Sequence, residues 1–185
     1  MIRSVERSVS AHVRTAILFG SFTLDAPDPL HDLVRTARAG SPEAILEIVS
    51  GVRREVTALW PELSDATVVP VPRHVPGPAH GLVVAVCDAI ADARGWRMAA
   101  DTLRRTRPAP EGKVGGARDP ETEAATLTWD GSTPGPVIVL VDDVVRSGAT
   151  MNACLSAVRA SGDGRRLLAV ALARAEIAGP GVDPT

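Results

Sequence analysis

The chain has 185 residues, of which 45% are hydrophobic and 23% are charged, and its formal net charge is -2. These values are typical of one folded domain, and they exclude a protein that binds nucleic acid or acidic membranes through its overall charge. No apolar run approaches the roughly 18 residues that a membrane span requires, and residues 1–20 lack the apolar core of an export signal.

The chain contains two cysteines, Cys87 and Cys154, too few for a four-cysteine zinc site. Both lie in apolar helical patterns, so we expect buried thiols in a reducing, cytoplasmic compartment. Aromatic residues make up 3% of the chain, and tyrosine is absent. Stacking platforms for single-stranded nucleic acid are therefore scarce, and nucleic-acid binding stays open without being favoured.

Residues 1–62 are predicted to form a small flanking element at the N-terminus. The predicted elements there are a strand over residues 16–22 and helices over residues 30–39 and 42–60. Ser41 supplies an N-cap, and Pro42 follows at the first helical position.

From residue 63 to 176, predicted strands and helices alternate. The strands cover residues 67–71, 96–103, 124–129, 137–141 and 165–173, and the helices cover residues 79–94 and 150–160. This alternation is typical of an α/β domain with a mainly parallel sheet and helices on both faces. Residues 104–119 are predicted to be a mobile loop and residues 177–185 a disordered tail. His80 is predicted to begin or cap a helix.

The stretch VIVLVDDVVRSGAT, residues 137–150, carries the clearest chemical signal. Its first five residues are apolar without polar alternation, as in a strand buried on both faces. Asp142 and Asp143 follow at the carboxyl end of that strand, where open α/β sheets bind ligands. Gly148 permits a left-handed turn, and the helix that begins next directs its free N–H groups toward an anion. The alternative is two surface acids followed by an ordinary helix cap.

This stretch resembles the phosphoribosyl pyrophosphate (PRPP) signature of type I phosphoribosyltransferases, except that Arg146 stands where a small or hydroxylic residue is commoner. The resemblance implies that Asp142 and Asp143 hold the ribose hydroxyls and contact Mg²⁺ indirectly, through PRPP or water. It also implies a cradle for the 5′-phosphate. The residues of that cradle are Val144, Val145, Arg146, Ser147, Gly148, Ala149 and Thr150. Arg146 adds positive charge to the cradle or points to solvent.

The resemblance implies two further contacts with PRPP. Arg73 and His74 follow the predicted strand 67–71, where these enzymes place their pyrophosphate loop. In the same family a mobile loop closes over PRPP and brings a basic side chain to the pyrophosphate. Lys113 and Arg105 are the candidates for that role in this chain, and solvent-exposed basic side chains are the alternative.

Residues 63–176 are also similar to the phosphoribosyltransferase-like domain of the competence protein ComF family. The segments that carry this similarity are VVPVPRH, LRRTRP, the 137–150 stretch and the closing ALARA. This chain departs from the family in three ways. It lacks the N-terminal four-cysteine zinc knuckle, it has VPGPAHG in place of the RGFNQ stretch, and it has acidic DPETEA in place of a basic run.

The expected activity is Mg²⁺-dependent binding of PRPP and transfer of its 5-phosphoribosyl group to the nitrogen of a nucleobase-like acceptor, with release of pyrophosphate. Two alternatives stay open: a ComF-like adaptor in DNA uptake, and a PRPP-sensing protein without turnover. A homodimer also stays open, and no membrane partner is expected.

Overall fold

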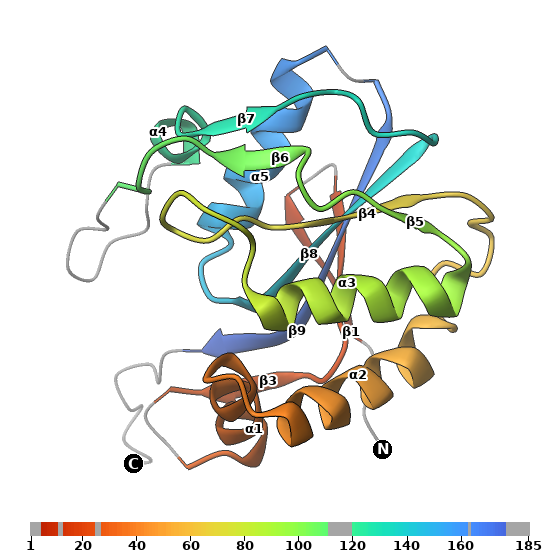
Figure 1. The fold of residues 1–185 in the computed structure, drawn as a ribbon, viewed down its shortest axis with the longest axis vertical. Helices are drawn as coiled ribbons and strands as arrows, with labels where there is room; N and C mark the ends of the chain where they lie inside the picture. Colours follow the sequence, from red (N-terminus) through yellow and green to blue (C-terminus); the bar gives the residue numbers. More distant parts are fainter. Residues whose placement is uncertain (1–4, 11–12, 25–26, 111–119, 163, 177–185) are drawn as a thin grey trace, which may run out of the picture.

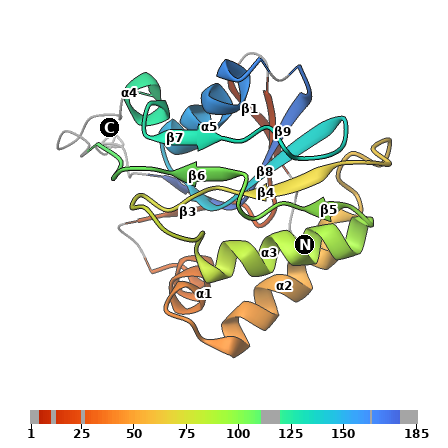
Figure 2. The same cartoon turned by 45° about the horizontal axis from the view of Figure 1, so that its top comes forward.

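A mainly parallel β-sheet forms the centre of the molecule, with helices against both of its faces (Figures 1 and 2). The computed structural model describes residues 5–10, 13–24, 27–110, 120–162 and 164–176. The predicted α/β fold class is confirmed, whereas the predicted tail, residues 177–185, lies outside the described residues. None of the helices in these ranges is long and apolar enough to cross a bilayer.

The strands of the central sheet have the order β1-β2-β9-β8-β4-β5, and β3 pairs with the far end of β9. Their bounds are β1 Val5–Ser10, β2 Val13–Ile17, β3 Ser21–Thr23, β4 Thr67–Pro70, β5 Arg97–Met98, β8 Val137–Val145 and β9 Arg166–Glu176. Within the described strands, β1 and β2 form the one antiparallel pair of this sheet. A separate antiparallel pair consists of β6 Leu103–Arg105 and β7 Leu127–Trp129.

Two hydrophobic layers cover the sheet because successive strand residues point to opposite faces. Val139 and Val141 of β8 pack toward the helices α1, α2 and α3, whereas Ile138 and Leu140 pack toward α5. The helix bounds are α1 Pro29–Arg38, α2 Pro42–Val56, α3 Gly81–Arg94, α4 Pro120–Ala124 and α5 Ala149–Ala160. The β6–β7 pair and α4 lie on the α5 side (Figure 2).

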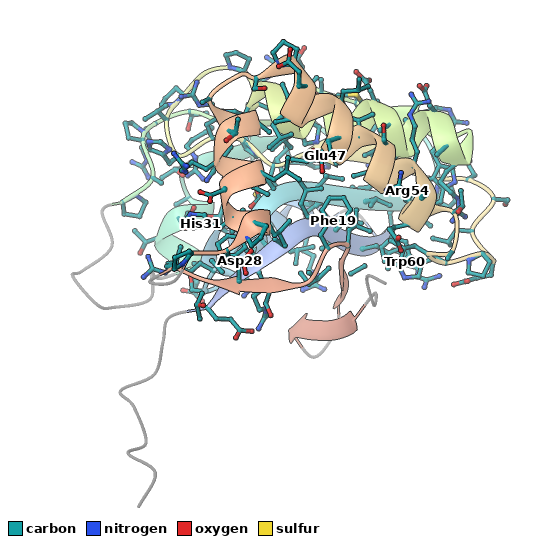
Figure 3. All side chains as sticks on the ribbon, turned by 90° about the horizontal axis from the view of Figure 1, so that it is seen from below. Phe19, Asp28, His31, Glu47, Arg54 and Trp60 are labelled. Atoms are coloured by element: carbon teal, nitrogen blue, oxygen red, sulfur yellow. The ribbon has the colours of Figure 1, made fainter. Side chains whose placement is uncertain are left out.

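The N-terminal region contributes strands as well as helices, so the sheet crosses the predicted boundary at residue 62. The strand predicted over residues 16–22 is two strands, β2 and β3, and β1 precedes them without a clear sequence signal. Phe19 lies in the bend between β2 and β3 and packs under α2 (Figure 3). A Cβ atom on Gly51 would stand 2.9 Å from Phe19 Cζ, so the glycine permits this close approach.

Helix α2 ends at Val56, four residues before the predicted end at residue 60. The Arg94 guanidinium lies against this end of the helix and binds backbone carbonyls there and in the segment that follows. These carbonyls belong to Val56, Leu59, Trp60 and Leu63. Trp60 has a left-handed backbone with φ 46°, which is incompatible with a continuing helix (Figure 3).

The structure differs from three predictions about the second half of the domain. The strand predicted over residues 96–103 stops at Met98, because a turn follows in which the Thr102 hydroxyl donates to the Ala99 carbonyl. The mobile loop predicted from residue 104 begins instead as strand β6, which pairs with β7. A short helix, α4, also precedes β7 where only a strand is predicted.

Candidate functional site

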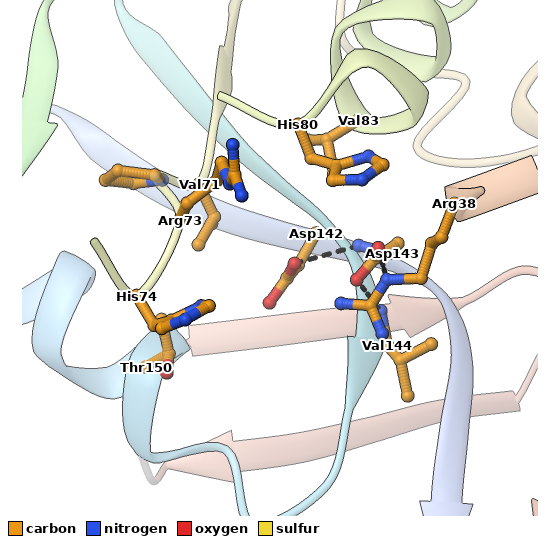
Figure 4. Close-up of a pocket in the computed structure, with 11 residues that line it drawn as sticks. Arg38, Val71, Arg73, His74, His80, Val83, Asp142, Asp143, Val144 and Thr150 are labelled. Carbon is orange, nitrogen blue, oxygen red and sulfur yellow. Dashed lines mark hydrogen bonds and ion pairs between the residues drawn. The ribbon is translucent and has the colours of Figure 1, made fainter. Parts of the chain in front are cut away.

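Asp142 and Asp143 lie within β8, not after it, because pairing with β9 continues through Val145. Being consecutive strand residues, the two side chains point to opposite faces of the sheet. The Asp143 N–H donates to Asp142 Oδ1 at 2.9 Å, and the Val144 N–H donates to Asp143 Oδ1 at 2.7 Å. Figure 4 shows Asp142 turned toward the side of Arg73 and Thr150, and Asp143 turned toward Arg38.

Arg38, in the last turn of α1, forms an ion pair with Asp143. Its Nε atom lies 2.7 Å from Asp143 Oδ2, and the Asp143 side chain is only 3% exposed. No pattern in the sequence points to this residue, since an arginine near a helix C-terminus is ordinary. The N-terminal region therefore supplies a charged side chain to the site, although residues 1–62 contain no recognisable binding motif.

The two acids have different electrostatic environments. Burial and the charge of the adjacent Asp143 raise the pKa of Asp142 to about 8, from an ordinary value of 3.8. The Asp143 N–H and the positive charge of Arg38 act in the opposite direction. A ligand that brings positive charge or hydroxyl donors to Asp142 would therefore stabilise its ionised form, which burial disfavours.

The predicted phosphate cradle is shorter than its seven residues. Val144 and Val145 belong to β8, and Val145 is buried, so the turn itself begins only at Arg146. Arg146 and Ser147 are exposed, and Gly148 has φ 78°, which turns the chain into α5. Since glycine is the N-cap of α5, no side chain caps that helix in the usual way. The Ser147 hydroxyl accepts from the Ala149 N–H at 3.3 Å.

Thr150, in the first turn of α5, is oriented by a contact that the sequence does not suggest. Its hydroxyl donates to Glu123 Oε1 at 2.9 Å. The hydroxyl proton therefore points to α4, so the donor that the threonine can offer to a phosphate is its backbone N–H.

Arg73 and His74 follow β4 as predicted, and both side chains are exposed. Their backbone carbonyls are held by the last residue of β6 and by the segment that follows it. Arg105 Nε donates to the Arg73 carbonyl at 2.6 Å, and the Ala109 N–H donates to the His74 carbonyl at 2.7 Å. The 73–74 loop is thus held through its backbone carbonyls, and these hydrogen bonds do not involve the side chains of Arg73 and His74.

A cavity of about 420 Å³ connects these groups (Figure 4). Its lining residues are Arg38, Val71, Pro72, Arg73, His74, His80, Val83, Asp142, Asp143, Val144 and Thr150. The structure therefore brings together six residues of the predicted site, which are Arg73, His74, Asp142, Asp143, Val144 and Thr150. It adds Arg38 and His80 to them.

His80 both caps α3 and lines this cavity. Its Nδ1 atom accepts a hydrogen bond from the Leu82 N–H at 3.2 Å. In the neutral ring the proton must then lie on Nε2, which makes that atom a donor. The sequence predicts the capping role alone.

The predicted contact between Arg105 and pyrophosphate is not supported by its position. The Arg105 side chain is buried, does not line the cavity, and forms an ion pair with Glu123 at 3.0 Å. Alternation in strand β6 directs it inward, toward the core under the small sheet. Lys113 lies outside the described residues, so its role stays a prediction.

The described residues contain no obvious covalent nucleophile in this cavity. Cys87 and Cys154 are buried free thiols in the two hydrophobic layers, and burial raises the pKa of each well above its ordinary value. Nor do the described residues include a group of three or more histidine, cysteine or acidic side chains that could hold a metal ion.

The fold and the cavity define an α/β protein with a polar site at the carboxyl edge of its parallel strands. No family model and no curated protein matches the chain. Among solved structures, it is similar to adenine phosphoribosyltransferase from Leishmania tarentolae, with a TM-score of 0.45 and 17% identity over 83% of this chain and 91% of that chain. It is also similar to the Leishmania donovani enzyme, with a TM-score of 0.43 and 19% identity over 84% of this chain and 70% of that chain.

Proposed function

We propose that this protein binds PRPP and transfers its 5-phosphoribosyl group to a nitrogen of a nucleobase-like acceptor, releasing pyrophosphate. The observation that carries the proposal is the cavity that Asp142, Asp143, Arg73, His74 and Thr150 share. The lining combines basic and donor side chains with carboxylates, which suits a ligand with both phosphates and vicinal hydroxyls.

Each part of PRPP has a counterpart in this cavity. Carboxylate oxygens accept hydrogen bonds from ribose hydroxyls, and the Asp142 side chain faces the cavity. The N-terminus of α5 offers N–H groups and the positive end of its dipole to the 5′-phosphate. Arg73, His74 and the Nε2 donor of His80 serve the pyrophosphate, whose negative charge grows as it leaves.

Mg²⁺ fits this donor set as a substrate-borne ion. Magnesium is commonly held by one or two carboxylates together with substrate phosphates and water. A nearby cation would favour the ionised form of Asp142, whose pKa is raised by burial and by the charge of Asp143. When bound, the ion would neutralise pyrophosphate charge. Asp142 and Asp143 would contact it indirectly, through the ribose hydroxyls or water.

The reaction needs no protein nucleophile. The bond between the anomeric carbon and the pyrophosphate oxygen breaks, and its electron pair leaves with pyrophosphate. The lone pair of the acceptor nitrogen forms the new bond to that carbon, and the acceptor later loses a proton. The residues of the cavity position the two reactants and stabilise the departing charge.

The acceptor is expected to enter beside Arg38, the side chain that α1 contributes. Within the class of phosphoribosyltransferases, the VVPVPRH and LRRTRP segments favour a relationship with the ComF family. A buried-thiol protein of this kind suits a reducing cytoplasm.

Calorimetry with PRPP and Mg²⁺ tests the binding site directly. We expect saturable binding to the wild-type protein and a loss of about tenfold or more in Asp142→Ala, because a hydroxyl-binding carboxylate is removed. Asp88→Asn, which changes an exposed acid of α3, is the control and should bind normally. Undiminished binding to Asp142→Ala would contradict the site.

A pyrophosphate-release screen over purine, pyrimidine and pyridine-carboxylate acceptors then identifies the reaction. Release with one acceptor class supports the transferase. Binding of PRPP without release under any acceptor would favour the sensing protein. Salt-sensitive binding of single-stranded DNA that PRPP leaves unchanged would favour the adaptor.

A further inference from the structure

An ion pair between Arg105 and Glu123 lies fully buried between the small β6–β7 sheet and α5. Arg105 Nη2 and Glu123 Oε1 are 3.0 Å apart, and both side chains have 0% exposure. Arg105 also donates through Nη1 to the Thr126 hydroxyl at 2.5 Å, just before β7. The guanidinium is thus held on two sides by the α4–β7 segment.

The same pair contacts both loops of the proposed PRPP site. On one side, Arg105 Nε donates to the Arg73 carbonyl at 2.6 Å. On the other side, Glu123 Oε1 accepts from the Thr150 hydroxyl at 2.9 Å. A single chain of hydrogen bonds therefore runs from the end of β4, through the buried pair, to the first turn of α5.

Stability does not explain this arrangement. Removing two charges from water is unfavourable, and a buried ion pair is often no more stabilising than apolar side chains of the same volume. Glu123 Oε2 is buried and has no hydrogen-bond partner within the part of the chain that the structure describes, which adds to the unfavourable term. What the pair offers that apolar residues cannot is directional contact with Arg73 and Thr150.

We propose that Arg105 and Glu123 are positioning residues that set the separation between the 73–74 loop and the N-terminus of α5. The inference rests on the proposed function, in which these two places bind the pyrophosphate and the 5′-phosphate of one molecule. PRPP joins both groups through a ribose of fixed size, so a loose separation would weaken its binding even though no ligand touches the buried pair.

The sharpest test replaces both charges at once. The double variant Arg105→Met/Glu123→Leu keeps an apolar, well-filled interior, so its melting temperature should stay near the wild-type value. Its affinity for PRPP with Mg²⁺ should fall about tenfold or more. Amide exchange should accelerate at Ala109, whose N–H donates to the His74 carbonyl, and at Asn152, whose N–H donates to the Gly148 carbonyl. Arg104→Met is the matched control, because Arg104 is its exposed neighbour on β6 and should change neither readout.

A second variant guards against misfolding of the double one. Glu123→Gln keeps the shape of the side chain and an acceptor for Thr150 but removes the charge that holds Arg105. It should weaken PRPP binding to a smaller extent and accelerate exchange mainly at Ala109.

The outcomes separate the two proposals. If the wild-type protein does not bind PRPP, the proposed function fails, and amide exchange alone decides whether the pair positions the loops. If the wild type binds PRPP and a stably folded double variant binds it equally well, with unchanged exchange at Ala109 and Asn152, the positioning role is refuted while the proposed function stands.

Discussion

Arg38 and Asp143 are more than 100 positions apart in the chain, yet Arg38 Nε lies 2.7 Å from Asp143 Oδ2. The carboxylate is almost fully buried, whereas the arginine side chain is 52% exposed. This pair links α1, at the edge of the N-terminal region, to the centre of the sheet. It also compensates one of two adjacent negative charges, which makes the acidic pair tolerable in the folded protein.

Replacing Arg38 should therefore destabilise the protein more than its exposure suggests. We expect Arg38→Ala to lower the free energy of unfolding by about 1–2 kcal/mol, because it leaves a buried carboxylate without its partner. Arg35→Ala is the control on the same helical turn, since the Arg35–Asp32 pair is exposed. Its effect should stay within about 0.5 kcal/mol in urea denaturation. Equal losses in both variants would show that the Asp143 carboxylate does not depend on Arg38.

The raised pKa of Asp142 predicts a characteristic pH dependence. Between pH 4 and 8 this group is ionised in the unfolded chain but protonated in the folded one, so the unfolded state binds fewer protons. Stability due to Asp142 must then fall as the pH rises through that window, by at most about 1.4 kcal/mol per pH unit.

Asp142→Asn removes this term and should be more stable than the wild type, with a difference that grows from pH 5 to pH 8. The same variant should lose PRPP affinity, since an amide cannot ionise to complement the ribose hydroxyls and the Mg²⁺ charge that the ligand brings. Unfolding free energies of both proteins, measured by denaturant titration across this range, provide the check. Parallel stability profiles would mean that Asp142 titrates normally.

His80 allows the capping and binding roles to be separated. Asparagine is a favourable N-cap residue, so His80→Asn should keep stability within about 0.5 kcal/mol, whereas His80→Ala should lose about 1 kcal/mol. Both variants remove the Nε2 donor from the cavity and should weaken PRPP binding equally. A His80→Asn protein that binds PRPP as the wild type does would restrict this residue to the cap.

Gly148 is required by its backbone conformation. Its φ of 78° lies in the left-handed region, where a Cβ is unfavourable by about 1–2 kcal/mol. Gly148→Ala should lose that much stability and, by shifting the N-terminus of α5, about tenfold in PRPP affinity. Gly81→Ala is the control, because Gly81 begins α3 outside the left-handed region and has open space around it. Comparable behaviour of the two variants would argue against a strained phosphate-binding turn.

Local chemistry made much of this protein predictable from its sequence. The apolar run of residues 137–141 indicates a buried central strand, and Ser41 with Pro42 marks the start of α2. Both signals act within a few residues, where backbone preferences and capping bonds are decided. The strand, the turn and the helix over residues 137–150 are confirmed for the same reason, although the strand continues past the two acids to Val145. The chemistry assigned to it stays a proposal.

Contacts between distant segments decided the rest. The sequence presents Arg38 and Arg105 as two ordinary arginines, one on a helix and one in a basic run. Packing of α1 against the sheet brings Arg38 to Asp143, while alternation in β6 buries Arg105 beside Glu123. A long side chain finds its partner only when the backbone has closed around it, so the roles of these residues depend on tertiary structure and leave no trace in local spacing.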